Sequence, residues 1–173
     1  MSLKTLKSKI RAIADWPKKG IVFRDITPVL ENAQTFQQLI DALAKPYSKR
    51  KVDMVVGVDA RGFILAAALA YKLKTGLAIV RKAGKLPRKT IKKNYALEYG
   101  KNTLEMHIDS IKPNQRVLVV DDLLATGGTI KATLDMVKKL GGKIIEVLFF
   151  IELKDLKGRR KLRGQKVRSL IKF

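Results

Sequence analysis

The run from Val117 to Thr129, VLVVDDLLATGGT, joins an apolar strand, a pair of carboxylates and a loop of small residues within thirteen positions. Its first residues, Val117 to Val120, form a continuous apolar stretch without polar alternation, which is typical of a strand buried on both faces of a parallel sheet. Asp121 and Asp122 follow at the carboxyl end of that strand, where ligands bind in open α/β sheets. The run therefore predicts an α/β fold with a ligand site at one edge of its sheet.

Small residues follow the two carboxylates and open the next predicted helix: Ala125, Thr126, Gly127, Gly128 and Thr129. Such residues let a phosphate approach consecutive backbone N–H groups at the positive end of the helix dipole. An ordinary turn, with Thr126 or Thr129 capping the helix, is the alternative. Adjacent carboxylates beside a phosphate loop would repel the anion unless they bound ribose hydroxyls or a magnesium ion. The whole run therefore favours a ribose-phosphate site.

Length and composition fit a single domain over residues 1–173. The chain has 46% hydrophobic residues, enough for one sizeable core, and no Ser/Gly/Pro-rich linker divides it. Its longest apolar stretch, Phe63 to Tyr71, is shorter than the ~20 residues of a membrane-spanning helix. The amino terminus lacks the apolar core of a signal peptide, and the absence of cysteine excludes disulfides and thiolate sites. We expect a cytoplasmic protein without membrane contact.

The charge is strongly unbalanced, because 37 Lys and Arg residues against 15 Asp and Glu residues give a net charge of +22. A polyanionic substrate accounts for part of this surplus. Lys4, Lys7, Lys9 and the tail from Lys157 to Lys172 lie outside the motifs that would contact a phosphate. Runs of this kind are commonly solvated faces, and a field this positive also attracts nucleic acid non-specifically.

Hydrophobic spacing predicts strands and helices that alternate along most of the chain. A first helix is expected over residues 3–13, before Trp16–Pro17, and a short strand over residues 21–23. Thr35 is the expected cap of a second helix. Beyond it, we expect strands over residues 52–58, 77–81, 116–120 and 143–151, and helices over residues 62–73 and 129–140. This order predicts a central, mainly parallel sheet flanked by helices.

One interval, from Arg88 to Ile111, breaks the alternation. Two stretches in which polar and apolar residues alternate lie on either side of Gly100–Asn102, which predicts an antiparallel hairpin. A hairpin inserted at the ligand edge of a parallel domain can close over the site as a lid. A purely decorative surface hairpin is the alternative.

A second segment of interest, VDARG from Val58 to Gly62, follows the strand predicted over residues 52–58 and so reaches the same edge of the sheet. Arg61 can bind pyrophosphate oxygens bidentately, and Gly62 lets the next helix start close to a ligand. In the alternative interpretation, Asp59 caps that helix and Arg61 faces water.

The run from Val117 to Thr129 resembles the phosphoribosyl-pyrophosphate motif of type I phosphoribosyltransferases, and matching segments extend the resemblance from about Ile10 to about Leu162. It does not resemble a Walker A loop, since Gly-x-x-x-x-Gly-Lys-Ser/Thr does not occur. The resemblance implies a type I phosphoribosyltransferase fold with a hairpin lid. It also implies transfer of ribose 5-phosphate from phosphoribosyl pyrophosphate to adenine, which yields AMP and pyrophosphate. Mg²⁺ would be bound through the substrate, near Asp121 and Asp122.

The same resemblance implies a pyrophosphate site. The VDARG loop would hold pyrophosphate and contain a cis peptide bond between Asp59 and Ala60. The segment RKAGKLP, which begins at Arg81, is similar to the family's RKxGKLP, whose basic residues reach the pyrophosphate of a neighbouring subunit. A homodimer with shared sites is therefore implied. The implied pyrophosphate-binding residues are Asp59, Ala60, Arg61, Arg81, Lys82, Lys85 and Tyr99.

A purine site is implied by GIVFRDITPVL, which begins at Gly20 and is similar to the family's adenine-binding segment. Phe23 would stack on the purine, and backbone groups of Val22 and Arg24 would read its ring nitrogen and amino group. Leu153 would cover the other face of the ring. Core packing is the alternative for Phe23 and Leu153.

Catalytic roles are implied for two residues, Arg61 at the leaving group and Glu98 in the lid segment YALEYG. A carboxyl group near purine N7 or N9 can act as a general acid, a general base or a hydrogen-bond acceptor. His107 is the only histidine, and we assign it no role. The ribose would be bound by Asp121 and Asp122, and the 5′-phosphate by residues 125–129.

Two other functions remain open at this level. The charge of +22 fits a nucleic-acid-binding regulator built on the same fold. Within the family, an enzyme for guanine or hypoxanthine is the nearest rival.

Overall fold

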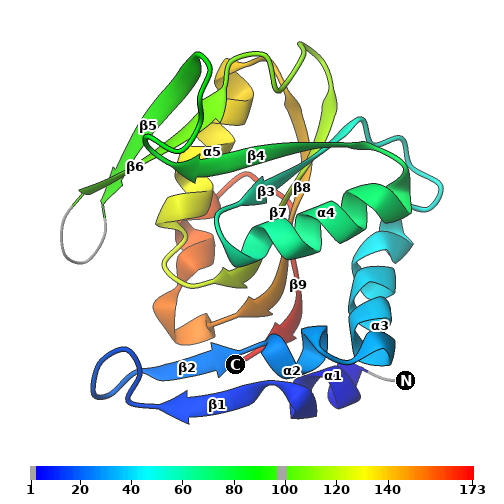
Figure 1. Ribbon diagram of the computed structural model, residues 1–173, viewed down its shortest axis with the longest axis vertical. Helices are drawn as coiled ribbons and strands as arrows, with labels where there is room; N and C mark the ends of the chain where they lie inside the picture. Colours follow the sequence, from blue (N-terminus) through cyan, green and yellow to red (C-terminus); the bar gives the residue numbers. More distant parts are fainter. Residues whose placement is uncertain (1–2, 97–100) are drawn as a thin grey trace. The chain divides into compact units, whose positions relative to one another are not determined.

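The computed structural model describes residues 3–96 and 101–173 and contains two compact units, Met1–Ala42 and Leu43–Phe173 (Figure 1). The first unit holds α1 (Leu3–Lys9), β1 (Arg11–Ala14), β2 (Val22–Asp25) and α2 (Thr27–Leu30). It also holds most of α3 (Ala33–Ala44). None of the helices within the described ranges combines the length and apolarity that a membrane span requires.

The first predicted helix is too long, because the structure ends α1 at Lys9 and turns Arg11–Ala14 into strand β1. This strand pairs antiparallel with β2, so that Ile13 lies opposite Phe23. A cis peptide bond joins Trp16 to Pro17 in the turn between the two strands. In the same turn, Asp15 Oδ1 accepts a hydrogen bond from the Gly20 N–H. Pairing with β2 thus overrides the helical spacing of the apolar residues.

The cap predicted for the second helix is also wrong. α3 begins at Ala33, and Asn32 Oδ1 accepts a hydrogen bond from the Thr35 N–H at 3.0 Å, which is the usual contact of a capping side chain. Thr35 therefore lies inside the first turn. Its hydroxyl donates to the Val29 carbonyl at 2.8 Å, which explains how a polar side chain is accommodated in a buried position.

The second unit is built on a seven-stranded sheet in the order β5-β6-β4-β3-β7-β8-β9. Five strands run parallel: β3 (Met54–Val58), β4 (Gly76–Lys82), β7 (Arg116–Leu124), β8 (Lys143–Glu152) and β9 (Val167–Lys172). β5 (Thr90–Ala96) and β6 (Lys101–His107) form an antiparallel hairpin joined to β4. The predicted fold class, a mainly parallel sheet with flanking helices and an inserted hairpin, is confirmed.

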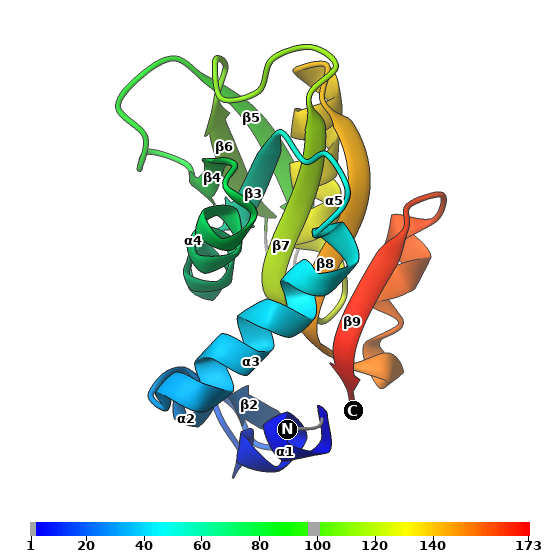
Figure 2. The same ribbon diagram turned by 90° about the vertical axis from the view of Figure 1, so that its right-hand side faces the viewer.

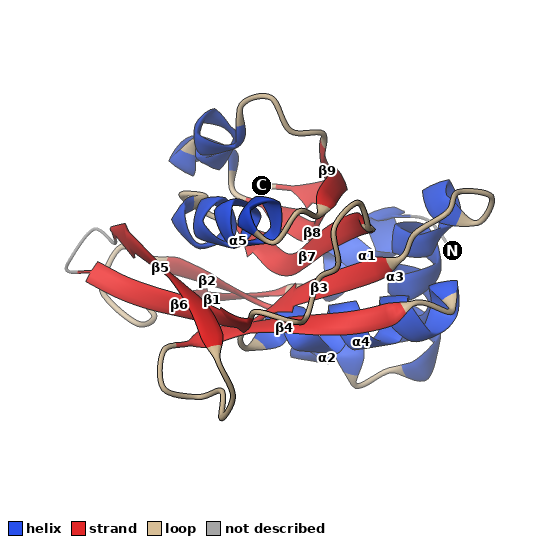
Figure 3. Cartoon of the chain, turned by 90° about the horizontal axis from the view of Figure 1, so that it is seen from above, coloured by secondary structure: helices blue, strands red, loops and turns tan. Residues whose placement is uncertain are grey.

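Helices cover both faces of this sheet. α4 (Arg61–Leu73) lies on one face and α5 (Gly128–Lys139) on the other, as Figures 2 and 3 show from two directions. The core beneath α5 contains Val119 and Phe149 from the strands and Leu134 from the helix, all almost completely buried. Complete burial of Val117–Val120 confirms the prediction of a central strand covered on both faces.

Several short elements were not predicted: α2, β9 and three 3₁₀ helices, η1 (Lys45–Tyr47), η2 (Lys154–Leu156) and η3 (Gly158–Leu162). β9 is the largest omission, because it lies in the basic tail that charge alone would assign to solvent. Its pairing with β8 buries Ile171, while most of its other side chains remain partly exposed. A strand at a sheet edge needs only a few inward apolar residues, so the high charge of the tail concealed it.

Candidate active site

The two carboxylates predicted to bind ribose lie at the centre of the second unit, inside β7 rather than beyond its end. β7 continues to Leu124 by pairing with β8, whereas its pairing with β3 stops at Val120. Asp121 and Asp122 therefore follow the last residue paired with β3. Relative to that neighbouring strand, they occupy the carboxyl edge that the sequence predicted.

Arg61 lies directly against this carboxylate pair. Its Nη2 is 2.8 Å from Asp122 Oδ2, and Asp122 is only 6% exposed. Asp121 Oδ1 in turn accepts a hydrogen bond from the Asp122 N–H at 2.9 Å. The structure thus brings together residues from two predicted segments, and the alternative in which Arg61 simply faces water does not hold.

A cis peptide bond joins Asp59 to Ala60 just before Arg61, as the resemblance implied. α4 begins at Arg61, and its second residue, Gly62, lies so close to β7 that a Cβ atom there would be 2.6 Å from Asp121 Oδ1. The absence of a side chain at Gly62 therefore serves the packing of helix against strand. This contact sets the position of Arg61, because the two residues are adjacent in the first turn of α4.

Electrostatics make the carboxylate pair suited to binding hydroxyl groups or a cation. Burial raises the pKa of Asp121 well above its ordinary value, and the neighbouring Asp122 carboxylate adds to this. Burial also raises the pKa of Asp122, although Arg61 opposes that shift. Two carboxyl groups held in this way favour partners that donate hydrogen bonds or carry positive charge.

The oxygen atoms of Asp121 and Asp122 are the type of ligand that Mg²⁺ prefers, but these two side chains alone do not complete its coordination shell. Mg²⁺ prefers oxygen ligands in octahedral geometry. Among the described residues, no group of three or more Asp, Glu, His or Cys side chains could hold a metal ion. A magnesium ion beside Asp121 and Asp122 would therefore need further oxygen ligands from water or a substrate.

The small-residue loop after β7 is shaped by contacts between backbones. Gly127 has a φ of +78° and precedes the first residue of α5, so neither Thr126 nor Thr129 caps the helix. A Cβ atom on Gly127 would lie 2.6 Å from the Gly158 carbonyl, and one on Gly158 would lie 2.2 Å from the Ala125 carbonyl. Residues 125–127 therefore pack directly on the start of η3, and Gly158 is a site residue that the sequence did not single out.

The predicted basic residues lie at the end of β4 and in the loop after it. Arg81 Nε is 3.3 Å from Asp59 Oδ2, and its Nη1 donates to the Lys85 carbonyl at 3.1 Å. Lys82 and Lys85 are exposed. Arg81 thus connects the cis-peptide loop with the basic loop, and Lys82 and Lys85 remain accessible to an anion.

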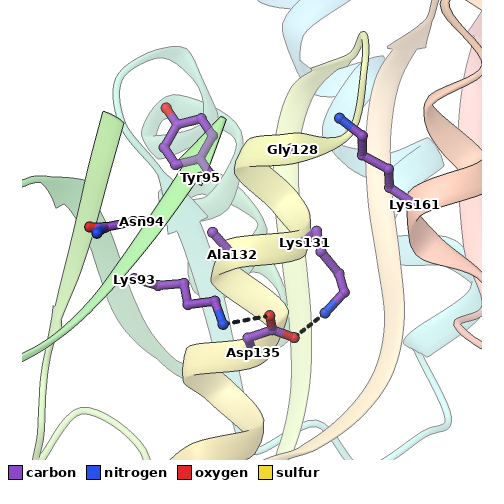
Figure 4. A pocket seen from close by; sticks show the side chains of 8 residues that line it. All are labelled: Lys93, Asn94, Tyr95, Gly128, Lys131, Ala132, Asp135 and Lys161. Carbon is purple, nitrogen blue, oxygen red and sulfur yellow. Dashed lines mark hydrogen bonds and ion pairs between the residues drawn. The ribbon is translucent and has the colours of Figure 1, made fainter. Parts of the chain in front are cut away.

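The hairpin packs against α5. Lys93 of β5 lies 3.3 Å from Asp135 of α5, and Lys131 forms an ion pair with the same carboxylate. Between the hairpin, α5 and η3 lies a cavity of about 180 Å³, in which the Lys93 and Lys131 side chains converge on Asp135 (Figure 4). The expected lid residues Glu98 and Tyr99 lie outside the described residues.

The residues expected to bind the purine belong to both units. Val22, Phe23 and Arg24 lie on β2 of the first unit, where Phe23 is half-buried and packs edge-on against Trp16 with ring centroids 4.4 Å apart. Trp16 was not predicted as a partner of Phe23. Leu153 follows β8 in the second unit and is also half-buried. Neither Phe23 nor Leu153 is a fully buried core residue.

Comparison with known proteins identifies the class. A family model described as the phosphoribosyl transferase domain matches residues 27–171, and the chain belongs to this family. The chain is 56% identical over 171 residues to an adenine phosphoribosyltransferase of Geotalea daltonii, with 99% of this chain and 100% of the relative covered.

Solved structures agree with this assignment. A crystal structure of adenine phosphoribosyltransferase from Thermoanaerobacter pseudethanolicus has a TM-score of 0.96 and 50% identity, covering 99% of this chain and 100% of that one. The enzyme from Saccharomyces cerevisiae, solved with an imino-altritol bisphosphate and adenine, has a TM-score of 0.93 and 38% identity, with 97% of each chain covered.

Burial of the carboxylate pair leads to a prediction about stability. A carboxyl whose pKa is higher in the folded than in the unfolded chain loses stabilisation as the pH rises through that interval. Asn cannot ionise, so Asp121→Asn should raise the free energy of unfolding at pH 7 by on the order of 1 kcal/mol, and the gain should shrink toward pH 4. Urea denaturation at both pH values, without magnesium, measures this.

Asp135→Asn is the matched control. Burial alone would raise the pKa of Asp135, but hydrogen bonds from Lys131 and Lys93 outweigh it and lower the pKa. This carboxylate therefore stabilises the folded chain above the unfolded pKa, and its loss should destabilise the protein at pH 7. Destabilisation by Asp121→Asn at neutral pH would contradict the electrostatic interpretation.

Proposed function

We propose that the chain is an adenine phosphoribosyltransferase, which transfers ribose 5-phosphate from phosphoribosyl pyrophosphate to adenine in purine salvage. The observation that carries this proposal is the Asp121–Asp122 pair held against Arg61, next to the loop of residues 125–129. The names of the relatives support adenine over guanine or hypoxanthine as the base. The products are AMP and pyrophosphate.

Positive charge at the leaving group is the main catalytic device in this proposal. As the bond between ribose and pyrophosphate breaks, negative charge builds on the pyrophosphate oxygens, and preorganised cations stabilise it. Arg61 and the exposed Lys82 and Lys85 supply that charge, together with Asp59, Ala60 and Arg81 as parts of the pyrophosphate site. Bound magnesium, when present with the substrate, supplies further charge neutralisation.

Positioning of the sugar is the second device. The first N–H groups of α5 have no partner within the helix, so a 5′-phosphate in the loop of residues 125–129 can accept their hydrogen bonds. Asp121 and Asp122 accept hydrogen bonds from the ribose hydroxyls. These contacts hold the anomeric carbon in line between the leaving pyrophosphate and the purine nitrogen, which attacks with inversion.

Recognition of the base is assigned to residues in each unit. Phe23 offers an aromatic face for stacking, and the backbone of Val22 and Arg24 offers a donor and an acceptor for the purine. Leu153 offers an apolar contact. Of the lid segment YALEYG, Tyr99 is assigned to the pyrophosphate site, and Glu98 to the purine as a general acid, a general base or a hydrogen-bond acceptor, while a closed lid excludes water.

The reaction itself provides the first test. Incubation of the protein with each purine, phosphoribosyl pyrophosphate and Mg²⁺ should give AMP from adenine and little nucleotide from guanine or hypoxanthine. The double variant Asp121→Asn/Asp122→Asn should lose at least 100-fold in turnover, because the ribose is no longer oriented, while circular dichroism shows a retained fold. Turnover near the wild-type rate in this variant would remove the carboxylates from the ribose site.

A homodimer in the cytoplasm is part of the proposal, and α4 offers the surface for the dimer contact. On its outward side Tyr71 is 89% exposed and Ile64 is 43% exposed, and Leu77 at the start of β4 is 42% exposed. Clustered exposed apolar side chains mark interaction sites in soluble proteins. The family resemblance implies that, in such a dimer, each copy contributes its basic loop to the neighbouring site.

Dimer formation can be tested with a matched pair of variants. Tyr71→Glu places a charge on the α4 face without disturbing the core, since this side chain is almost fully exposed. It should convert the dimer to a monomer in light scattering and lower AMP synthesis at low protein concentration. Leu156→Glu replaces an apolar residue that is 43% exposed on η2 and should leave the mass unchanged. A monomeric wild type would end this part of the proposal.

The surplus of positive charge supports a second candidate activity, non-specific attraction of nucleic acid. Arg159 and Arg168 of the tail pair with Glu152 and Glu146. The described segment 154–166 also carries a group of exposed basic residues with Asp155 as its only acid: Lys154, Lys157, Arg160, Lys161, Arg163 and Lys166. The Lys161 side chain extends toward the cavity that Lys93 and Lys131 also line (Figure 4).

Filter binding with RNA and DNA at several salt concentrations tests this attraction. The wild type should bind at low salt and release steeply as salt rises, because each phosphate contact releases counterions. A variant with Lys157, Arg160, Lys161 and Arg163 changed to Gln should bind more weakly and show a shallower salt dependence. The control changes Lys4, Lys7, Lys9 and Lys19 to Gln and removes the same charge elsewhere. Equal effects of both variants would show that net charge, not the tail, causes the attraction.

A further inference from the structure

Glu105 is a buried carboxylate at the junction between the hairpin and the basic loop after β4. It lies on β6, where it is the register partner of Arg81 on β4 and of Lys92 on β5. Glu105 is only 2% exposed to solvent. A charged side chain in such a position requires partners that repay its desolvation.

Those partners are mainly backbone groups of the basic loop. Glu105 Oε1 accepts hydrogen bonds from the Lys85 N–H at 2.8 Å and from the Leu86 N–H at 2.9 Å. Its Oε2 accepts one from the Thr90 hydroxyl at 3.3 Å and lies 4.0 Å from Lys92 Nζ. Burial raises the pKa of Glu105, but these interactions outweigh burial and leave the pKa below its ordinary value. The side chain is therefore an anion that accepts from two consecutive amides.

The Lys85 peptide is held from the opposite direction as well. Its carbonyl accepts a hydrogen bond from Arg81 Nη1 at 3.1 Å, and Arg81 Nε contacts Asp59 Oδ2 at 3.3 Å. Gly84, with a φ of +84°, makes the turn just before it. Both polar groups of the Lys85 backbone are thus tied to fixed strands, although the residue lies in an exposed loop.

We propose that Glu105 is a positioning residue, which preorganises the loop carrying Lys85, just beyond Lys82 at the end of β4, for binding pyrophosphate and phosphoribosyl pyrophosphate. The physical reason is entropic. A free loop would have to be ordered when the anion binds, and that ordering would weaken binding, whereas a loop already held by Glu105 and Arg81 does not incur this cost. The inference rests on the proposed function, in which these lysines contact pyrophosphate.

Two substitutions at Glu105 separate the effect of its hydrogen bonds from the effect of its charge. In Glu105→Gln, the amide oxygen can still accept from both the Lys85 and Leu86 N–H groups. In Glu105→Met, a side chain of similar length fills the same space but accepts no hydrogen bond of comparable strength. Glu146→Met is the control, since Glu146 is a buried carboxylate that bonds Tyr47 at 2.5 Å and Arg168 at 3.2 Å, all outside the proposed site.

Steady-state kinetics and calorimetry then give the test. Glu105→Met should raise the KM for phosphoribosyl pyrophosphate and the Kd for magnesium pyrophosphate about 10-fold, while kcat and the KM for adenine change about 2-fold or less. Glu105→Gln should restore both affinities to within about 3-fold of the wild type. Glu146→Met should lower the melting temperature without a selective change in either affinity.

Three outcomes would overturn the inference: affinities in Glu105→Met equal to those in Glu146→Met, no rescue by Gln, or equal losses for adenine and phosphoribosyl pyrophosphate. If Glu105→Met does not fold, hydrogen exchange of the wild type decides, because the Lys85 and Leu86 amides must exchange slowly for residues in an exposed loop. Fast exchange would overturn the proposal. A wild type that forms no AMP would instead overturn the proposed function.

Discussion

The contact between Arg61 and the Asp121–Asp122 pair is the interaction on which the rest of the second unit depends. Two adjacent carboxylates on a central strand are costly to bury, and a single guanidinium at 2.8 Å offsets only part of that cost. Arg61 can reach Asp122 because α4 begins against β7, and α4 can begin there because Gly62 has no side chain. A larger residue at position 62 would move the helix, the arginine and the cis-peptide loop together.

A second set of close backbone approaches supports the loop of residues 125–129, the proposed 5′-phosphate site. Thirty residues lie between Gly127 and Gly158 in the sequence. In the fold, a Cβ atom at either position would collide with the backbone of the other segment. This packing holds residues 125–127 in place independently of any ligand. The loop proposed to bind the 5′-phosphate is thus preorganised by η3, a short element of the basic tail, so part of that tail supports the proposed site through its backbone.

Acidic residues are few in this chain, and their placement organises the many basic ones. Asp59 holds Arg81, Glu105 holds the loop of Lys85, and Asp135 draws Lys93 of the hairpin to α5. Each of these carboxylates therefore orients a basic segment around the proposed pyrophosphate and phosphate sites. The other exposed lysines and arginines are spread along the chain, with a group of six in the segment 154–166, and their charge acts through the field of the whole protein.

Local patterns in the sequence determined the parts of the protein that depend on neighbouring residues: the buried strand of Val117–Val120, the hairpin after β4 and the loop of residues 125–129. They also placed Asp121, Asp122 and Arg61 at one edge of the sheet, since parallel strands end together. Only the tertiary structure decided that Ile10–Ala14 leaves the helix to pair with β2, that β9 completes the sheet, and that Gly158 and Glu105 support the site. These outcomes depend on contacts between residues far apart in the chain, and helical spacing or charge at one position carries no information about such a partner.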